Sequence, residues 1–468
     1  MSPTRSALAA SVYAQLPVFA QNWACTIAGW QRARARFTPH FHATLSQWEA
    51  SLSLADEELV RIQWHRLRRL LEHSRQNVPH YADLPPAVEH ADPREALTRS
   101  LARIPPLEKS TYRDATQTLL ARNLPREQLI RGKTSGTTGS ALALWWTQEA
   151  LAEEFAAIWR ARRQHGVAIR DANLTFNGQI VVPWSQQTPP YWRRNGWNGQ
   201  TLFSLYHCSP ENLQHYVEAV HETPALYAQG YPSSLHLVAR ALLDAGRPLA
   251  PGRLRACFTS SESLLAFQRE AIEAAFGAPV RDRYGVSEFC VSMNECPQGR
   301  LHVDMEFGIV EVEVEEECDE WQRGPLLVTG FANDATPLIR YRVGDVGTRS
   351  RRPCPCGRAG DVFLGVDGRI EDYVRTPDGR LVGRLDHVFK EQLDVAEAQI
   401  LQQAAEAIEV RVVRRPSYDQ ASERGLLKEF RSRLGDAIEI DLRYVDSIPR
   451  ESNGKFRAVK SKVGRLNP

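Results

Sequence analysis

The chain has 468 residues, of which 43% are hydrophobic and 24% charged, and 58 basic against 56 acidic residues leave a net charge of +2. These values are ordinary for a globular protein with two or three domains. The near-balance of charge gives no reason to expect nucleic acid or an anionic membrane as a partner, because long-range steering needs a lopsided field. Small-molecule chemistry is therefore the first hypothesis.

The N-terminal stretch 6–31 contains no charged residue. A transmembrane helix needs about 18 or more apolar residues in succession, and four residues break the run before that length: Gln15, Pro17, Gln21 and Asn22. We predict an amphipathic segment and no transmembrane span. A signal peptide cleaved near Ala20 is the alternative. The basic residues that follow, up to Arg36, suit a solvated helix face better than an acidic surface.

A helix is predicted over 55–76, because apolar residues such as Val60, Trp64 and Leu67 recur at spacings of three and four. A second helix is predicted in "SPENLQHYVEAV", with Ser209 as its N-cap and Pro210 in its first turn.

Strand-like segments alternate with such helices, and the segments are 225–230, 256–262, 309–314 and 325–330. The alternation through 130–280 predicts an α/β fold with a largely parallel sheet, and the alternating pattern of 309–314 predicts an antiparallel addition.

The pattern changes near Gly368. Beyond it come a polar turn, a helix-like stretch from His387, strand-like segments at 408–415 and 438–445, and a helix from Ala421. This is the size of a small separate α+β domain. We therefore predict two domains, a large one over 1–368 and a small one over 369–468.

The loop "RGKTSGTTGS", residues 131–140, is rich in glycine and hydroxyls. It is not a Walker A loop, because Glu127 stands where the first glycine is required. No strand-associated G-x-G-x-x-G is present either. Gly136 and Gly139 would let the backbone N–H groups face an anion while the hydroxyls add donors. The alternative is a flexible connection.

Three distant segments favour the phosphate-binding interpretation. They are "YGVSE" at 284–288, "RYRVGD" at 340–345 and "PRESNGKFR" at 449–457. They contain, in order, an aromatic ring four residues before a carboxylate, an acid suited to ribose hydroxyls, and a lysine in a glycine-containing turn. Together with "SSE" at 260–262 and "GRIED" at 368–372, this order resembles the adenylate-forming superfamily. Within it the chain looks most like the phenylacetate-CoA ligase-like branch and its CapK-like members.

The resemblance implies that ATP and a carboxylic acid form an acyl-adenylate and pyrophosphate, after which an acceptor displaces AMP. It implies that Lys455 is the adenylation lysine and that the Glu288 carboxylate binds Mg²⁺. It also implies that the Tyr284 ring stacks on adenine, that Asp345 binds the ribose hydroxyls, and that Glu371 or Asp372 is the hinge between the domains. The other nucleotide-binding positions it implies are Thr134, Ser135, Gly136, Thr137, Thr138, Gly139, Ser261, Glu262, Gly285 and Arg369. The small domain would swing to present Lys455 for the first step only.

Eight irregularly spaced cysteines suit a reducing compartment, so the cytoplasm is expected. Two short pairs, Cys296 with His302 and Cys354 with Cys356, could supply the four ligands of a tetrahedral zinc site with no open coordination position. Cys290 is the alternative fourth ligand. The other interpretation is four reduced side chains that never meet.

The acid cannot be named from the sequence. Segments around Phe176 and Gly230 and a tryptophan-rich run are expected to supply the acyl pocket, and their aromatic side chains favour an aryl or apolar acid. The acceptor is expected to be CoA or another thiol. The alternative acceptor is an amine or a carrier in polysaccharide or natural-product assembly. The alternative class of protein is a degenerate member that binds nucleotide without ligation. Whether the protein forms a homodimer is left open by the sequence.

Overall fold

The computed structural model describes residues 12–133, 142–183, 185–208, 211–369, 374–377, 381–382, 385, 394–450 and 456–463. The helices are α2 (Val18–Arg36), α3 (Pro39–Ala50), α4 (Asp56–Asn77), α5 (Pro93–Ala102), α6 (Lys109–Asp114), α7 (Thr116–Leu119), α8 (Gln148–Arg163), α9 (Leu213–Glu222), α10 (Pro232–Asp244), α11 (Ala266–Phe276) and α12 (Gln420–Leu434). Within these ranges no helix combines the length and apolar character needed to cross a bilayer.

The strands are β1 (Ile130–Lys133), β2 (Ala143–Trp146), β3 (Asn173–Asn177), β4 (Trp192–Asn195), β5 (Gln200–Ser204), β6 (Tyr227–Gly230), β7 (Ala256–Ser260), β8 (Val280–Gly285), β9 (Ser292–Glu295), β10 (Leu301–Val303), β11 (Gly308–Val312), β12 (Glu316–Glu317), β13 (Trp321–Gly330), β14 (Tyr341–Ser350), β15 (Val362–Arg369), β16 (Val374–Arg375), β17 (Leu381–Val382), β18 (Val395–Ala404), β19 (Ala407–Arg414), β20 (Glu439–Tyr444) and β21 (Val459–Ser461).

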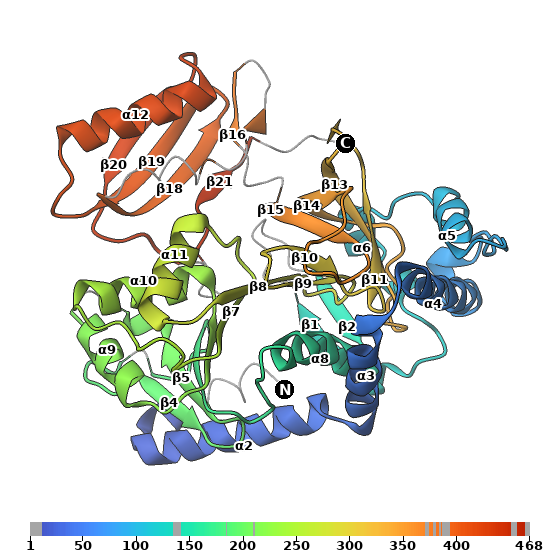
Figure 1. Cartoon of the computed structure of the whole chain (residues 1–468), viewed down its shortest axis with the longest axis horizontal. Coiled ribbons are helices and arrows are strands. Elements are labelled where there is room, and N and C mark those ends of the chain that lie inside the picture. Colours follow the sequence, from blue (N-terminus) through green and yellow to red (C-terminus); the bar gives the residue numbers. More distant parts are fainter. Residues whose placement is uncertain are drawn as a thin grey trace.

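One large sheet organises the first 369 residues (Figure 1). Its strand order is β11-β13-β14-β15-β10-β9-β8-β7-β6-β3-β5-β4, with β12 beside β13. The neighbours among β3, β5, β6, β7 and β8 are parallel, and the remaining pairs are antiparallel. The predicted mixed α/β fold is confirmed, including the antiparallel strand β11 within the 309–314 segment.

Helices cover both faces of the parallel part, because successive side chains of a strand point to opposite faces. Tyr227 and Phe258 pack in a cluster with residues of α3 and α8. Their neighbours Ala228 and Cys257 pack in a cluster with α9, α10 and α11. A parallel sheet buried on both faces leaves the carboxyl ends of its strands as the place where ligands bind.

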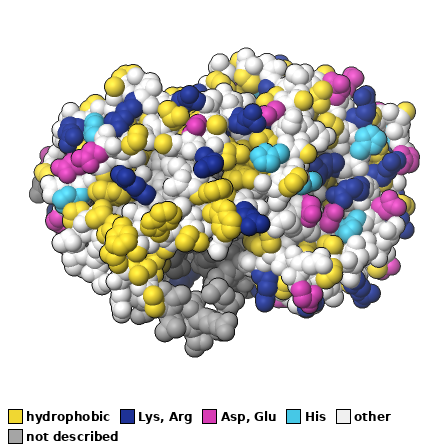
Figure 2. Space-filling view, turned by 90° about the horizontal axis from the view of Figure 1, so that it is seen from below, with side chains coloured by type: hydrophobic (Ala, Val, Ile, Leu, Met, Phe, Trp, Pro, Cys, Tyr) yellow, Lys and Arg dark blue, Asp and Glu magenta, His cyan; other side chains and the backbone are white. Residues whose placement is uncertain are grey.

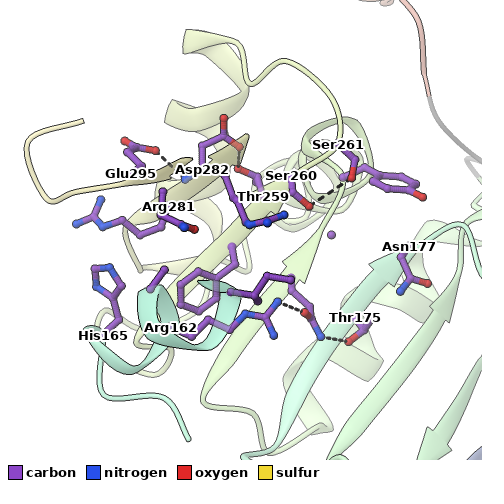
Figure 3. A pocket seen from close by; sticks show the side chains of 18 residues that line it. Arg162, His165, Thr175, Asn177, Thr259, Ser260, Ser261, Arg281, Asp282 and Glu295 are labelled. Carbon is purple, nitrogen blue, oxygen red and sulfur yellow. Dashed lines mark hydrogen bonds between the residues drawn. The ribbon is translucent and has the colours of Figure 1, made fainter. Parts of the chain in front are cut away.

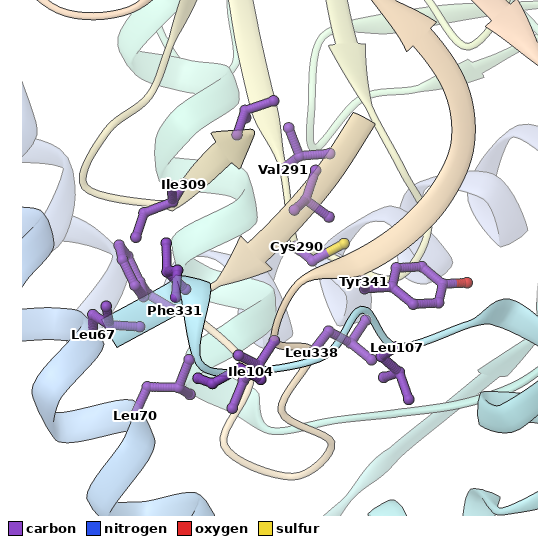
Figure 4. Packing of buried hydrophobic residues seen from close by; sticks show 14 of the residues in the cluster. Leu67, Leu70, Ile104, Leu107, Cys290, Val291, Ile309, Phe331, Leu338 and Tyr341 are labelled. Carbon is purple, nitrogen blue, oxygen red and sulfur yellow. The ribbon is translucent and has the colours of Figure 1, made fainter. Parts of the chain in front are cut away.

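The antiparallel half is covered by α4, which begins and ends within one residue of its predicted bounds. Leu67 and Leu70 of α4 are fully buried in a cluster that also holds Phe331 and Tyr341 (Figure 4). This cluster fixes the start of β14, from which the candidate site residue Asp345 projects.

The helix predicted from "SPENLQHYVEAV" is confirmed, but its predicted start is wrong. The structure begins α9 at Leu213 with Asn212 in the N-cap position. Ser209 and Pro210 lie outside the described residues. Residues 211 and 212 form a turn instead of the first helical turn.

The C-terminal residues form a four-stranded sheet of order β20-β19-β18-β21 with α12 packed on it (Figure 1). Its core is its own and includes Ile400, Val410, Leu426 and Phe430. Strands β19 and β20 and helix α12 lie where they were predicted. Strand β18 was missed, because "VAEAQILQQA" is composed mostly of good helix formers. The residues from His387 to 393 lie outside the described residues.

Candidate functional site

Two predicted nucleotide-binding residues meet between β8 and β14. The Tyr284 hydroxyl donates a hydrogen bond of 2.6 Å to Asp345 Oδ2. Burial and the adjacent Asp345 carboxylate raise the pKa of Tyr284, so the phenol keeps its proton and remains a donor. Arg369 lies directly opposite Asp345 in the β14–β15 ladder. The three positions therefore share one corner of the sheet.

Glu288 lies in the turn that follows β8 and is buried. Its Oε1 accepts a hydrogen bond of 3.2 Å from the Tyr341 hydroxyl. The next residue, Phe289, has φ 54° and stacks on Trp146 with ring centroids 4.8 Å apart. A non-glycine residue at positive φ is strained and persists only where its surroundings impose it. The turn that carries Glu288 is thus held by packing against β2.

The predicted phosphate loop connects β1 to β2, whose ends pair at Lys133 and Ala143. The loop residues Thr134, Ser135, Gly136, Thr137, Thr138 and Gly139 lie outside the described residues. Both of the loop's anchor strands are described. Trp146, at the other end of β2, packs on Phe289, so β2 contacts the Glu288 turn.

The segment after β7 contacts the C-terminal part of the chain. Ser261 has φ 73° and is exposed. Glu262 Oε2 accepts a hydrogen bond of 3.1 Å from the backbone N–H of Ser233 at the start of α10. Glu262 Oε1 accepts one of 2.8 Å from the backbone N–H of Phe456. Phe456 is the residue after Lys455, which itself lies outside the described residues.

Gly285, the remaining predicted position on this turn, ends β8. A Cβ atom there would lie 2.7 Å from the Arg283 guanidinium, so the absence of a side chain lets Arg283 lie against the strand. Ser260 pairs with Arg283 across the β7–β8 ladder. The "SSE" and "YGVSE" segments therefore leave neighbouring strands side by side.

A cavity of about 290 Å³ opens beneath these segments, between α8 and the strands β3, β6, β7 and β8 (Figure 3). Its lining includes Asn177, Gly230, Ser260 and Ser261 near the carboxyl ends of the strands. Asn177 and Gly230 belong to the segments predicted for the acyl pocket. The predicted aromatic lining is found in part: Tyr231 of the predicted 230–232 segment lines the cavity together with Phe258, whereas Phe176 is buried and stacks on Phe203 in the core.

Polar side chains line the deep part of this cavity. Arg162 of α8 donates to Gln229 Oε1. The Gln229 amide nitrogen donates in turn to Asn173 Oδ1 at 3.2 Å and to Thr175 Oγ1 at 2.9 Å. Arg281 and His165 also reach this end of the cavity (Figure 3).

The predicted metal ligands Cys296, His302, Cys354 and Cys356 lie together. All four ligand atoms lie within 4.8 Å of one another. The Cys296 and Cys354 sulfur atoms are 3.7 Å apart, and Cys356 Sγ lies 3.3 Å from His302 Nε2. Tetrahedral zinc with Zn–S bonds of about 2.3 Å requires S···S distances of about 3.8 Å. The donor set therefore fits zinc in both chemistry and spacing.

The antiparallel strands around this cluster explain why distant residues meet. Cys296 follows β9, His302 belongs to β10, and a tight turn with Gly299 at φ 70° joins the two strands. The loop that carries Cys354 and Cys356 leads into β15, which pairs with β10 at His302. Burial, and secondarily Arg358, lower the pKa of His302 to about 4, so the ring is neutral as a metal ligand must be. Cys290, the alternative ligand, is packed in the core of the antiparallel half.

Sequence reasoning missed Tyr341 and Arg162. Tyr341 lies inside the quoted "RYRVGD" motif, so its place next to the motif's acid was a usable signal. Arg162 carried no such signal, because it is one of three arginines near the end of α8. Only the fold shows that Arg162 lines the cavity, whereas Arg160 is buried with Asp304 and Glu306.

Comparisons with known proteins agree with this arrangement. Residues 374–462 match the family model described as the CapK C-terminal domain. Protein CapK of Staphylococcus aureus is 24% identical over 95% of this chain and 98% of its own length. A phenylacetate-coenzyme A ligase of Thermus thermophilus is 23% identical over 87% of this chain and 97% of its own.

Among solved structures, 2-hydroxyisobutyryl-CoA ligase in its postadenylation state aligns with a TM-score of 0.67 at 18% identity, over 88% of this chain and 91% of the ligase. The same ligase in its thioesterification state aligns over the same shares with a TM-score of 0.54 at 19% identity. The chain is similar to Protein CapK and to a phenylacetate-coenzyme A ligase along almost its full length, and residues 374–462 match the CapK C-terminal domain. It shares its fold with the 2-hydroxyisobutyryl-CoA ligase.

Proposed function

We propose that this protein is an ATP-dependent acid ligase, which forms an acyl-adenylate with release of pyrophosphate and then transfers the acyl group to CoA or another thiol. The observation that carries the proposal is the 2.8 Å hydrogen bond from the Phe456 backbone to Glu262. It joins the residue after Lys455 to the segment beside Tyr284, although the two are almost 200 positions apart. The names of the relatives support the reaction class.

In the first step a carboxylate oxygen attacks the α-phosphorus, the bond to the β-phosphate oxygen breaks, and pyrophosphate leaves. Lys455 stabilises the charge that builds between the carboxylate and the α-phosphate. Hydroxyl and N–H donors of the 134–140 loop hold the β- and γ-phosphates. In the second step the thiol sulfur attacks the carbonyl carbon, the bond to AMP breaks, and the thiol proton passes to solvent.

Glu288 fits the magnesium role on one structural observation. Its buried carboxylate accepts a hydrogen bond from Tyr341, and among the described residues no arginine or lysine pairs with it. A buried carboxylate without a cationic partner is costly unless a cation joins it. Mg²⁺ held there beside phosphate oxygens would neutralise charge on the leaving pyrophosphate. Tyr284 and Asp345 would orient adenine and ribose, with Arg369 as an added donor.

The division into domains 1–368 and 369–468 is part of the proposal. The C-terminal unit has its own core, and the ligase of known structure aligns better in its postadenylation state than in its thioesterification state. We infer that the arrangement with Phe456 on Glu262 belongs to the first half-reaction. The hinge candidates Glu371 and Asp372 lie outside the described residues.

We also propose that Cys296, His302, Cys354 and Cys356 hold a structural zinc ion. The spacing of their ligand atoms supports this assignment. Four protein ligands leave no position for a substrate or a water, so such an ion would stabilise the fold and take no part in the reaction.

Pyrophosphate release tests the ligase function. Purified protein with ATP and Mg²⁺ is incubated with a panel of aryl, aliphatic, hydroxy and dicarboxylic acids, with CoA, with an amine, or with neither. We expect acid-dependent pyrophosphate release and, with CoA, a thioester that absorbs at 232 nm or is detected by mass. Hydroxamate formation with hydroxylamine traps the activated acid independently of the acceptor. If no acid in the panel gives release above the acid-free rate, the proposal fails.

A further inference from the structure

The substrate cavity holds two arginines that lack an acidic partner. Among the described residues no carboxylate forms an ion pair with Arg162 or Arg281, whereas Arg283 pairs with Glu154 at 2.8 Å and Arg269 pairs with Glu295 at 2.8 Å. The Arg162 guanidinium lies 5.1–5.7 Å from the ring centroids of Trp159, Tyr227 and Phe258. Arg281 Nε is buried and has no hydrogen-bond partner among the described residues.

A network of neutral side chains fixes Arg162 in place. Gln229 accepts from Arg162 and donates to Asn173 and Thr175, and both Asn173 and Thr175 are buried. None of these partners neutralises the positive charge. Orienting a buried cation without neutralising it costs free energy, which an anionic ligand would recover.

Asp282, which follows Arg281 in β8 and also lines the cavity, is a weak acid. Asp282 accepts a hydrogen bond of 2.6 Å from Thr259 Oγ1, and burial raises the pKa of Asp282 to about 7. Near neutral pH its carboxyl is therefore protonated for much of the time. Glu295, the other acid in the lining, is already engaged by Arg269. The deep end of the cavity keeps a positive charge.

We propose, on the basis of the ligase function above, that the acid substrate carries a second anionic group, which Arg162 and Arg281 bind at the end of the cavity away from Ser261 and Asn177 (Figure 3). The reacting carboxylate would lie at the mouth, where Ser260 and Ser261 join the cavity to the Glu262 segment (Figure 3). A cavity of about 290 Å³ suits a short acid, because larger drug-sized ligands occupy pockets of up to about 1,000 Å³.

Matched acids of equal length test this substrate class. Pyrophosphate release is measured with succinate against butyrate, with glutarate against valerate, and with phenylacetate. We expect kcat/KM to favour a diacid over its monoacid by at least about 100-fold. Arg162→Gln should raise KM for that diacid by about 10-fold or more, change kcat little, and reduce the preference for the diacid over its monoacid by a similar factor.

Arg163→Gln is the matched control, because Arg163 is the next residue of α8 but pairs with Glu49 outside the cavity. It should leave both acids unchanged. Preference for a monoacid or phenylacetate, with no effect of Arg162→Gln on discrimination, would overturn the substrate class while leaving the ligase function intact. Absence of release with every acid would instead overturn the ligase function.

A second observation, independent of the cavity, concerns α2. Three hydrogen bonds fix one face of α2 along β4. The side chains of Gln21, Asn22 and Thr26 accept them from the Arg193 side chain, the Arg194 backbone N–H and the Gly196 backbone N–H, respectively. The opposite face is apolar and exposed, and its residues are Leu16, Phe19, Trp23, Ile27 and Trp30. Phe19 and Trp23 are 69% and 66% exposed, which is unusual for such large apolar side chains.

Charge indicates what covers this face. The first acidic residue of the chain is Glu49, while Arg32 and Arg34 are exposed at the end of α2 and Arg194 is exposed beside it. Figure 2 shows hydrophobic side chains gathered on the lower face of the molecule with basic side chains beside them. We infer that α2 lies on an anionic lipid surface, with tryptophan and phenylalanine at the headgroup level and arginines against the phosphates.

Vesicle flotation tests this surface with the full-length protein. We expect binding to vesicles of phosphatidylcholine with 30% phosphatidylglycerol, about 10-fold weaker binding to phosphatidylcholine alone, and loss of binding in Phe19→Ser/Trp23→Ser. Val314→Ser, at another exposed apolar position, is the control and should bind normally. Equal binding to both vesicles, or no binding together with a dimer that the double substitution dissociates in light scattering, would overturn the inference.

Discussion

Lys455→Ala is expected to reduce kcat for pyrophosphate release by on the order of 10²–10³ or more, with KM for ATP changed by less than about threefold. An ammonium that contacts both the attacking carboxylate and the α-phosphate acts mainly on the charge of the transition state, so its loss lowers kcat and leaves ground-state binding almost intact. The neighbouring backbone contact, Phe456 on Glu262, uses no side-chain atom of Lys455 and should survive the substitution.

Lys462→Ala is the control for this prediction. Lys462 is an exposed lysine seven residues further along the same segment, so its removal takes away an equal charge without touching the reacting groups. It should retain the wild-type rate and melting temperature. Wild-type pyrophosphate release by Lys455→Ala would remove the lysine from the mechanism, and a lowered melting temperature would assign it a structural role.

The parts of the fold that could be predicted are those in which local pattern and tertiary structure agree. The apolar spacing of α4 and the apolar runs of β6 and β7 report burial directly, because each element buries the face that its period defines. Strand β18 shows the limit. Its sequence favours a helix, and pairing with β19 on one side and β21 on the other overrides that preference.

The candidate site likewise contains residues that sequence motifs could indicate and residues that only the fold brings together. Tyr284, Glu288 and Asp345 were proposed from motifs that resemble a known family, and the structure brings Tyr284 and Asp345 into direct contact. The segments at one end of the cavity were predicted, because Asn177 and Gly230 belong to them, but the polar character of its other end could not be anticipated. That character depends on Arg162 and Gln229, which are 67 positions apart and meet only because α8 packs on the sheet face that includes β6. Phe176, an aromatic residue of a segment predicted for the pocket, packs in the core instead.

Cys354→Ser is expected to lower bound zinc from about one ion per chain to near zero. The substitution removes a thiolate from a closed set of four, and structural zinc contributes directly to folding free energy. A loss of about 3 kcal/mol would lower the melting temperature by roughly 4 °C in a domain of this size. Because β9, β10 and β15 meet at this cluster, local opening should follow there first, which hydrogen exchange of residues 292–303 can detect.

Cys25→Ser is the matched control, because Cys25 is as buried as Cys354 but lies in α2, outside the cluster. Metal analysis should give unchanged zinc in this variant, and any cost of burying a hydroxyl in place of a thiol appears equally in both. Zinc content that stays at the wild-type level in Cys354→Ser would contradict the assignment. Zinc lost without a change in pyrophosphate release per folded molecule would agree with a structural ion, because a closed tetrahedral site offers the substrate no coordination position.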